Sequence, residues 1–489
     1  MTGIVLAAKL PLTTLLMLGG FVALLIIGWS YANWRAAVKV AFVAVLLEGA
    51  IRKWLLPSGE ELVYFLKDIF LVGAYLRFYL SPDPELRTLR LRVPGTLIFL
   101  LCSAVSFSAL NPNIGSPLLA AYGVKIYFMY LPLTFMMPYL FRTQQELLRQ
   151  LTWYVLLAVP ICLLGVLQFK SDRFSMINTF ASGMGETGAV GFGVGDRARV
   201  TGTFSYISGH TTFVVVFYIL SVVLLTLKET PRKWLIIFVV VPLLAGNALM
   251  GGSRASMVSI AFVTFGFALA AMGGRLGTAR NFVITLVVGG VLALAGGVYF
   301  FADALVHFEA RAKGAETVKG RVMDHPLAAL ELAVKEGGLF GYGIGTAHSA
   351  TAAIRKKLGI LPLKKAVPGM DNELGQIFAE LGLFGFLGWY GLRILLLWLN
   401  WRAFLTSPPG VIRAICLAAV LIQFPHIVMS VVYNHTANFF IFALSGVGLI
   451  PLLEMRLQRR FVPLGRGAGT DPSQRSAAVS TKNTLRQRH

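Results

Sequence analysis

The chain has 489 residues, of which 56% are hydrophobic and only 13% charged, and its formal net charge is +22. A mean hydropathy of +0.72 excludes an ordinary soluble protein of this length and indicates an integral membrane protein. A basic chain can also bind nucleic acid, but here the cations are spread over loops and a tail whose one aromatic residue is Phe461, so we expect no nucleic-acid partner.

Apolar runs of about 18 residues or more recur along the chain, as is typical of membrane-spanning helices. The first run is too long for a cleaved signal peptide and leads directly into further spans. The sequence therefore predicts an all-α polytopic integral membrane protein with about 12–13 transmembrane helices. We place the spans at 11–30, 37–56, 62–80, 94–110, 117–140, 147–169, 206–227, 233–250, 255–272, 281–301, 373–400, 411–432 and 436–454.

The three cysteines lie inside apolar runs, which argues against a disulfide framework or a zinc site. We expect Cys102, Cys162 and Cys416 to be small buried hydrophobic residues. Because the chain has no HExxH, CxxC or Walker motif, we also expect no metal and no other cofactor.

Short loops on one side of the predicted bundle are basic, whereas the connections at 111–116 and 433–435 have no Lys or Arg. This asymmetry follows the positive-inside rule and predicts a cytoplasmic C-terminus. Two long loops, at about 170–205 and 302–371, then face the other side. The predicted inner cations are Arg35, Lys39, Arg77, Arg87, Arg90, Arg92, Arg142, Arg149, Lys228, Arg232, Lys233, Arg275, Arg280, Arg402 and Arg413.

Residues 1–455 are predicted to form a single transmembrane domain, and residues 456–489 a separate tail. The tail has seven Arg and one Lys against one acid, Asp471, and is rich in Ser, Thr, Gln and Gly. Such a composition favours disorder and contact with anionic lipid at the cytoplasmic surface.

The first long outer loop contains seven glycines and ends with Arg197 and Arg199 just before the next span. Arg254 stands at the mouth of another span on the same side. Arginines at these places either snorkel to the interface or bind an anion. Arg52 and Lys53 lie at the outer end of their own span and join this group.

The second long loop contains Arg321 and His325, followed by a predicted amphipathic helix at 326–336 and a glycine-rich turn with His348. If the helix extends back to residue 321, Arg321 and His325 share a face. Gly341 to Gly345 has a GxGxxG-like look, but without a strand–turn–helix context it does not indicate dinucleotide binding.

That loop closes with Asp371-Asn372-Glu373, where Asp371 is placed either to cap the next helix or to handle a proton. Other charges are embedded in apolar runs, where they must pair or line a cavity. We expect Lys125 to form an ion pair with Asp68 or Glu48. The embedded charges are Glu48, Lys67, Asp68, Lys125 and Glu380.

Taken in order, several short motifs resemble the superfamily of O-antigen ligases and Wzy-type polysaccharide polymerases. The resemblance covers about residues 195–390. Its motifs are Arg199-Val-Thr-Gly-Thr-Phe204, Gly252-Ser-Arg-Ala255, Gly320-Arg321, Gly341-Tyr-Gly-Ile-Gly345, Asp371-Asn-Glu373 and Glu380-Leu-Gly-Leu-Phe-Gly385.

The resemblance implies a GT-C-like fold in the bacterial inner membrane. It also implies metal-free transfer of a glycan from undecaprenyl-pyrophosphate to an acceptor sugar, or to a lipid-linked acceptor, at the periplasmic face. Arg254 and Arg321 map onto the family arginines that handle pyrophosphate, and Arg199 is a third candidate. We add Arg52 and Lys53 from their position.

Where the ligases usually have His-Asn, this chain has Asp371-Asn372. Asp371 is therefore the expected general base, and the alternatives are His348, His325 and Glu373. The missing histidine favours a polymerase of O-antigen or exopolysaccharide over a ligase acting on lipid A-core, which stays the alternative.

The chemistry supports the same interpretation. Breaking a glycosyl–pyrophosphate bond builds negative charge that arginine forks stabilise, and a carboxylate accepts the proton of the attacking hydroxyl. Attack opposite the leaving group inverts the anomeric carbon. An alternative of another class is a transporter or flippase for a lipid-linked oligosaccharide, which broken spans with charges near the midplane would favour.

Overall fold

The computed structural model describes ten segments of the chain, all within the compact unit Met1–Leu453. They are 12–56, 63–82, 95–179, 189–192, 197–276, 302–313, 324–348, 351–357, 359–360 and 372–453. The predicted tail at 456–489 and the predicted span at 281–301 lie outside them.

The regular secondary structure of these segments is helical, and their only β-pairings are the isolated bridges Asp172–Arg197 and Gly191–Ala198. Seven helical stretches are long and apolar enough to cross a membrane, which confirms an all-helical, multi-pass membrane protein. The seven are Pro117–Tyr139, Gln144–Lys170, Ile207–Thr226, Lys233–Met250, Arg254–Met272, Glu373–Thr406 and His435–Leu453.

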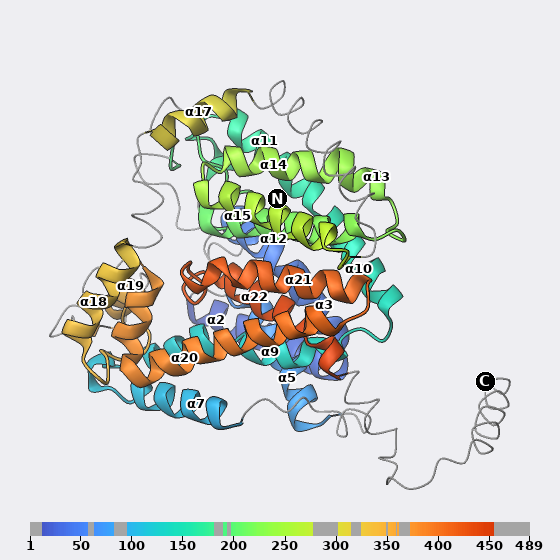
Figure 1. The fold of residues 1–489 in the computed structure, drawn as a ribbon. Coiled ribbons are helices and arrows are strands. Elements are labelled where there is room, and N and C mark those ends of the chain that lie inside the picture. Colours follow the sequence, from blue (N-terminus) through green and yellow to red (C-terminus); the bar gives the residue numbers. More distant parts are fainter. Residues whose placement is uncertain are drawn as a thin grey trace, which may run out of the picture. The chain divides into compact units, whose positions relative to one another are not determined.

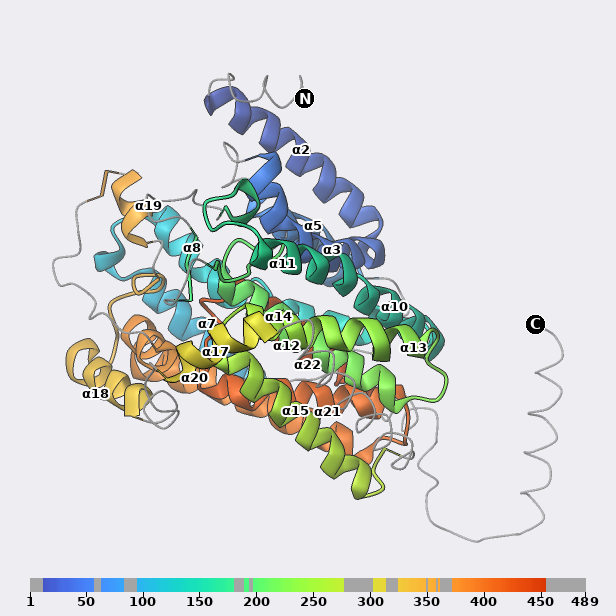
Figure 2. The same ribbon diagram turned by 90° about the horizontal axis from the view of Figure 1, so that it is seen from above.

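The helices follow one another along the described chain as seen in Figures 1 and 2. The α-helices are α2 (Leu12–Ala32), α3 (Trp34–Ala50), α5 (Leu66–Tyr75), α7 (Gly95–Ala109), α8 (Pro117–Phe128), α9 (Leu131–Met136), α10 (Gln144–Leu156), α11 (Ala158–Lys170), α12 (Ile207–Thr226), α13 (Lys233–Leu235), α14 (Val241–Met250), α15 (Arg254–Met272), α17 (Ala302–Lys313), α18 (His325–Gly337), α19 (Thr351–Lys357), α20 (Glu373–Thr406), α21 (Val411–Gln423) and α22 (His435–Val447). Short π- and 3-10 segments are η1 (Ile51–Leu55), η3 (Leu76–Leu80), η4 (Pro112–Ile114), η5 (Met137–Tyr139), η6 (Met176–Asn178), η7 (Ile236–Val240) and η9 (Pro425–Ile427).

The other predicted spans in the described chain coincide with helices that are shorter or interrupted. The span expected at 11–30 corresponds to α2, whose apolar stretch is Met17–Ala32, and the span expected at 411–432 corresponds to the shorter apolar helix Val411–Ile427. The expected span at 37–56 is α3 continued by η1, and that at 62–80 is α5 continued by η3. The amphipathic helix expected at 326–336 is α18.

Two helices form the centre of the packing. In α12 and α22, 78% and 83% of the most apolar stretch is buried, against 28% in α15. α12 packs against α10, α14, α15, α21 and α22, and its side chains from Thr212 to Thr226 are all buried. A helix that is apolar all round, as α12 is, belongs in such a position.

The cysteines make no disulfide in the described chain. Cys162 and Cys416 are buried as expected, but Cys102 is exposed on α7. The expectation of a buried thiol was wrong there because α7, apolar all round, turns that face away from its neighbours.

The long helix α20 is broken at Gly382, whose backbone (φ 67°, ψ −170°) lies in a region open essentially to glycine alone. A break frees carbonyls that a membrane environment cannot hydrate, so they need partners from the protein. Residues 339–348, which we call the docking loop, supply them. The Tyr342 N–H donates to the Ala379 carbonyl (2.6 Å) and the Gly343 N–H donates to the Glu380 carbonyl (3.1 Å).

The exchange is reciprocal, because the Leu383 N–H, released by the break, donates to the carbonyl of Leu339 (3.1 Å). The Ser108 hydroxyl of α7 also donates to the Glu380 carbonyl (2.9 Å). α18, just before the docking loop, packs along α20. The GxGxxG-like stretch thus supplies backbone N–H groups that bind the free carbonyls at the break in α20.

Candidate functional site

The segment 199–205, just before α12, carries Arg199 and contacts two other parts of the bundle. The Val200 N–H donates to the Met250 carbonyl at the end of α14 (3.2 Å). The guanidinium of Arg199 donates to the carbonyls of Gly251 (2.9 Å) and Gly252 (3.5 Å). Arg199 is therefore held beside the turn that leads into α15.

Arg254 is the first residue of α15 and is half-buried. It follows Gly252 by two residues, so the structure brings Arg199 and Arg254 to the same turn. The N-terminus of a helix also presents unpaired N–H groups, which favour an anion at this place.

The other side of segment 199–205 faces the end of α3. Lys53 is 4% exposed, and its ammonium donates to the Thr201 hydroxyl (3.1 Å) and the Gly202 carbonyl (2.7 Å). The Arg52 guanidinium donates to the Ser205 hydroxyl (2.9 Å). Of the five predicted pyrophosphate-binding cations, Arg52 and Lys53 therefore donate to segment 199–205, Arg199 belongs to it, and Arg254 follows the turn that Arg199 contacts.

Two buried ion pairs lie next to Arg52 around the ring of Tyr64. The Lys67 ammonium lies 2.6 Å from Glu48, and the Lys125 ammonium lies 2.8 Å from Asp68. The second pair confirms the expected partner of Lys125. We call these four residues, together with Arg52 and Lys53, the cationic cluster; it has four cations against two carboxylates.

The ring of Tyr64 lies at the middle of this cluster. Cations stand near its face at 4.2 Å (Lys125), 5.1 Å (Lys67) and 5.2 Å (Arg52) from the ring centre. Such contacts offset part of the cost of bringing cations together away from water. They also connect α3–η1, α5 and α8 at one place.

Two histidines adjoin the cluster. The His435 ring, at the start of α22, lies 5.2 Å from the Tyr64 ring and 6.1 Å from the His348 ring. Both ring nitrogens of His435 are buried and have no hydrogen-bond partner among the described residues. Buried polar atoms are nearly always satisfied in proteins, so these two indicate a place where a ligand or water completes the contacts.

His348 lies in the docking loop between the rings of Tyr122 (5.5 Å) and Tyr433 (5.6 Å). Burial, reinforced by the nearby Lys125 ammonium, lowers the pKa of His348 to about 4. Its imidazole is therefore neutral near pH 7.

Glu380 fixes the docking loop next to these histidines. Its carboxylate accepts the Ala347 N–H (2.7 Å) and the Tyr127 hydroxyl (2.9 Å), and the side chain is fully buried. Because Ala347 precedes His348 directly, this contact determines where the imidazole lies.

Glu373 is occupied by internal contacts. Its carboxylate accepts the N–H groups of Val431 (2.6 Å) and Val432 (2.7 Å) and lies 3.3 Å from the guanidinium of Arg393. It holds the turn before α22 to the start of α20. This arrangement favours an anchoring role over that of a general base.

The cap of α20 is Asn372, whose side chain accepts the Leu374 N–H (2.9 Å). The cap expected at Asp371 was therefore placed one residue early. Asp371 and Arg321 lie outside the described residues. His325 is exposed at the first residue of α18.

Sequence reasoning missed two members of the site. Tyr64 looked like an ordinary residue of an apolar run, and His435 stood in a short connection between two spans. A signal for His435 was available in the sequence. It lies between Asn434 and Thr436 in a short connection on the side opposite the basic loops, and three polar residues in a row are unusual in so short a connection.

No protein-family model, no curated protein and no solved structure matches this chain. The arrangement of its residues is therefore the basis for assigning a function.

Proposed function

We propose that this chain is an inverting, metal-independent glycosyltransferase of the bacterial inner membrane. It moves a glycan from undecaprenyl-pyrophosphate to an acceptor sugar hydroxyl at the periplasmic face. The product that we propose is a polymer, either an O-antigen or an exopolysaccharide. Transfer to lipid A-core, as by a ligase, is the alternative within the same chemistry. The resemblance of residues 195–390 to that superfamily is one support.

The observation that carries the proposal is the gathering of cationic side chains at segment 199–205. Arg52 and Lys53 donate to this segment, and Arg199, which belongs to it, donates to the turn that leads to Arg254. Guanidinium and ammonium groups brought to one place favour an anionic ligand, because they are the side chains that bind phosphate oxygens. A pyrophosphate is such a ligand.

In the proposed reaction the acceptor hydroxyl attacks the anomeric carbon as the bond from that carbon to the pyrophosphate oxygen breaks. The pyrophosphate leaves with the bonding electrons, and Arg254, Arg199 and Arg321 stabilise its growing charge. Asp371 accepts the hydroxyl proton, with His348 as its substitute.

His348 is supported as the substitute base by its neutral imidazole beside the cationic cluster. With a pKa of about 4, His348 is a weak base, and a carboxylate in water is about equally weak. Either group can still accept the proton efficiently if it is held close to the attacking hydroxyl. Glu380 holds His348 in place through the N–H of Ala347.

A transporter for a lipid-linked oligosaccharide is favoured by one observation, the break of α20 beside the buried Glu380. Yet the carbonyls of Ala379 and Glu380 are bound by the docking loop, and the Glu380 carboxylate has two protein donors. The polar groups at the break are thus bound by protein. This arrangement favours a structural role for the break over a role in binding a transported ligand.

Reconstitution separates these functions. The purified full-length chain is placed in liposomes with an undecaprenyl-pyrophosphate-linked glycan and an acceptor glycan, and products are analysed by mass spectrometry. A new glycosidic linkage supports the transferase, whereas glycan crossing the bilayer without a new linkage supports the transporter. Product containing both repeats on the lipid carrier identifies a polymerase.

The matched variants are Arg254→Ala and Arg402→Ala. Arg402 lies near the other end of α20 with its guanidinium 5.6 Å from the Trp398 ring, away from the site. We expect Arg254→Ala to lower transfer at least a hundredfold, as loss of a charge-stabilising donor does elsewhere. Arg402→Ala should transfer normally; equal activity of both variants would contradict the proposal.

A further inference from the structure

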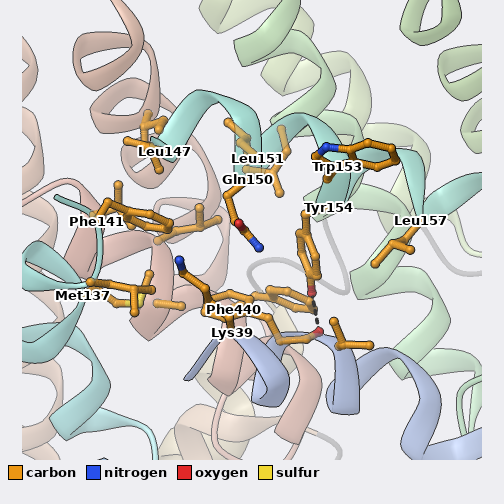
Figure 3. Close-up of a pocket in the computed structure, with 18 residues that line it drawn as sticks. Lys39, Met137, Phe141, Leu147, Gln150, Leu151, Trp153, Tyr154, Leu157 and Phe440 are labelled. Carbon is orange, nitrogen blue, oxygen red and sulfur yellow. Dashed lines mark hydrogen bonds between the residues drawn. The ribbon is translucent and has the colours of Figure 1, made fainter. Parts of the chain in front are cut away.

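The described chain contains an apolar crevice far along α3 and α22 from the cationic cluster. It has a volume of about 190 Å³ and opens between α3, α10 and α22. Figure 3 shows it, with Lys39 and Phe440 on one side and Leu151 and Tyr154 on another. Lys39 lies fourteen residues before Lys53, near the opposite end of the α3–η1 helix.

Its walls suit a hydrocarbon chain. Leu147, Leu151 and Leu444 line it together with the rings of Phe42 and Phe440, and the polar side chains among its lining residues are Lys39, Gln150 and Tyr154. The Tyr154 hydroxyl is satisfied, since it donates to the Phe42 carbonyl (2.8 Å). A chain entering here meets mostly methyl, methylene and aromatic surface.

The mouth of the crevice is positive. Lys39 lines it and pairs with Glu146 (2.7 Å), so that this acid is already neutralised. Arg142 stands exposed beside the same acid, to which its backbone N–H donates (3.0 Å). Arg232 lies 4.8 Å from the ring of Trp153, another lining residue.

We propose that this crevice is a binding site for an anionic phospholipid, independent of the function proposed above. One acyl chain occupies the apolar walls, and the phosphate lies beside Arg232, where its guanidinium stands over the ring of Trp153. The charge at this border carries the choice, because a zwitterionic lipid would bring its own cation towards the guanidinium group. A neutral occupant would make no ion pair with it.

The site differs from ordinary lipid contact in its enclosure. Phe440 and Leu444 belong to α22, the most buried of the seven spans, and a lipid that only surrounds the bundle does not reach that helix. Trp153, 56% exposed, stands at the border between crevice and surroundings. It therefore reports on an occupant by its fluorescence.

The test uses the full chain in vesicles of dibrominated phosphatidylglycerol or dibrominated phosphatidylcholine, diluted with the unbrominated lipids. Bromine in the chain quenches nearby tryptophan, and subtracting the emission of Trp153→Phe isolates the signal of Trp153. We expect phosphatidylglycerol to quench that signal at about fivefold lower mole fraction, the factor that one cation near an anionic headgroup contributes. Equal quenching by the two lipids overturns the proposal.

Two variants locate the occupant. Arg232→Gln should remove the preference for phosphatidylglycerol, whereas Arg402→Gln, at an exposed site outside the crevice, should keep it. Ala443→Leu, which fills the wall, should reduce quenching by both lipids. A preference that survives Arg232→Gln, or quenching that survives filling, places the lipid elsewhere and overturns the proposal.

Discussion

The ammonium of Lys53 donates to the carbonyl of Gly202 across 2.7 Å and to the hydroxyl of Thr201 across 3.1 Å. These bonds join the end of α3–η1 to the segment that carries Arg199. The approach is close, because a side chain on Gly49 would collide with the Thr203 carbonyl. Lys53 thus belongs to the cationic cluster and also holds segment 199–205 against the end of α3–η1.

Lys53→Met keeps the length of the side chain and removes both hydrogen bonds. We expect the free energy of unfolding to fall by about 1–3 kcal/mol, because the Gly202 carbonyl loses a charged donor in a buried place. Unfolding in detergent measures the change. Lys170→Met, at an exposed residue, is the control, and equal stability of the two variants would contradict the fastening role.

Gly382→Ala tests the break of α20. The backbone conformation alone costs alanine about 1–3 kcal/mol, and the added methyl would collide with the Leu339 carbonyl of the docking loop. We expect a lower thermal midpoint and loss of transfer. Gly388→Ala, in the same helix with its nearest neighbour at 3.5 Å, should behave as wild type. If both variants are normal, the docking loop does not depend on the break.

Glu373→Gln distinguishes an anchor from a base. Removing the charge leaves Arg393 buried without its carboxylate, which costs about 3–5 kcal/mol. We expect a destabilised protein, and partial recovery of stability in the double variant Glu373→Gln with Arg393→Met. A variant as stable as wild type but inactive in transfer would instead identify Glu373 as the base.

His348 gives the chain a dependence on pH. Its pKa is about 4 in the folded protein and near 6.5 when unfolded, so the unfolded state binds the proton more readily. Its contribution to stability is full above pH 6.5 and is lost as pH falls through 6.5 towards 4, by on the order of 3 kcal/mol at most. His348→Gln should unfold with a shallower pH dependence over that range; parallel curves for both proteins would refute the assignment.

Much of the fold could be predicted because a membrane helix must be apolar along a minimum length, which sequence reveals directly. The spans around α12, α15 and α22 follow from this rule. Where helices are broken or shortened, the rule weakens. The sequence of α20 is one continuous apolar run through Gly382, and the break appears only in the backbone conformation of Gly382 and its contact with Leu339.

For the candidate site, charge in an unusual place was a sufficient signal for Lys125, Arg52 and Lys53. Charge gave no signal for Tyr64 or His435, because neither side chain is an obvious charge and an aromatic ring next to apolar residues does not stand out in the sequence. Their role comes from helices far apart in sequence that meet at one place. Such contacts depend on packing and are not written in any local pattern.

The two buried ion pairs, Lys67–Glu48 and Lys125–Asp68, have a consequence for the way the chain enters the membrane. Each joins charges from different segments, and none of these segments can rest alone in hydrocarbon with an unpaired charge at low cost. We therefore expect the region from α3 to α8 to leave the insertion machinery as a group. On that expectation, a ribosome stalled between α5 and α8 should leave a nascent chain that is not yet integrated in the bilayer.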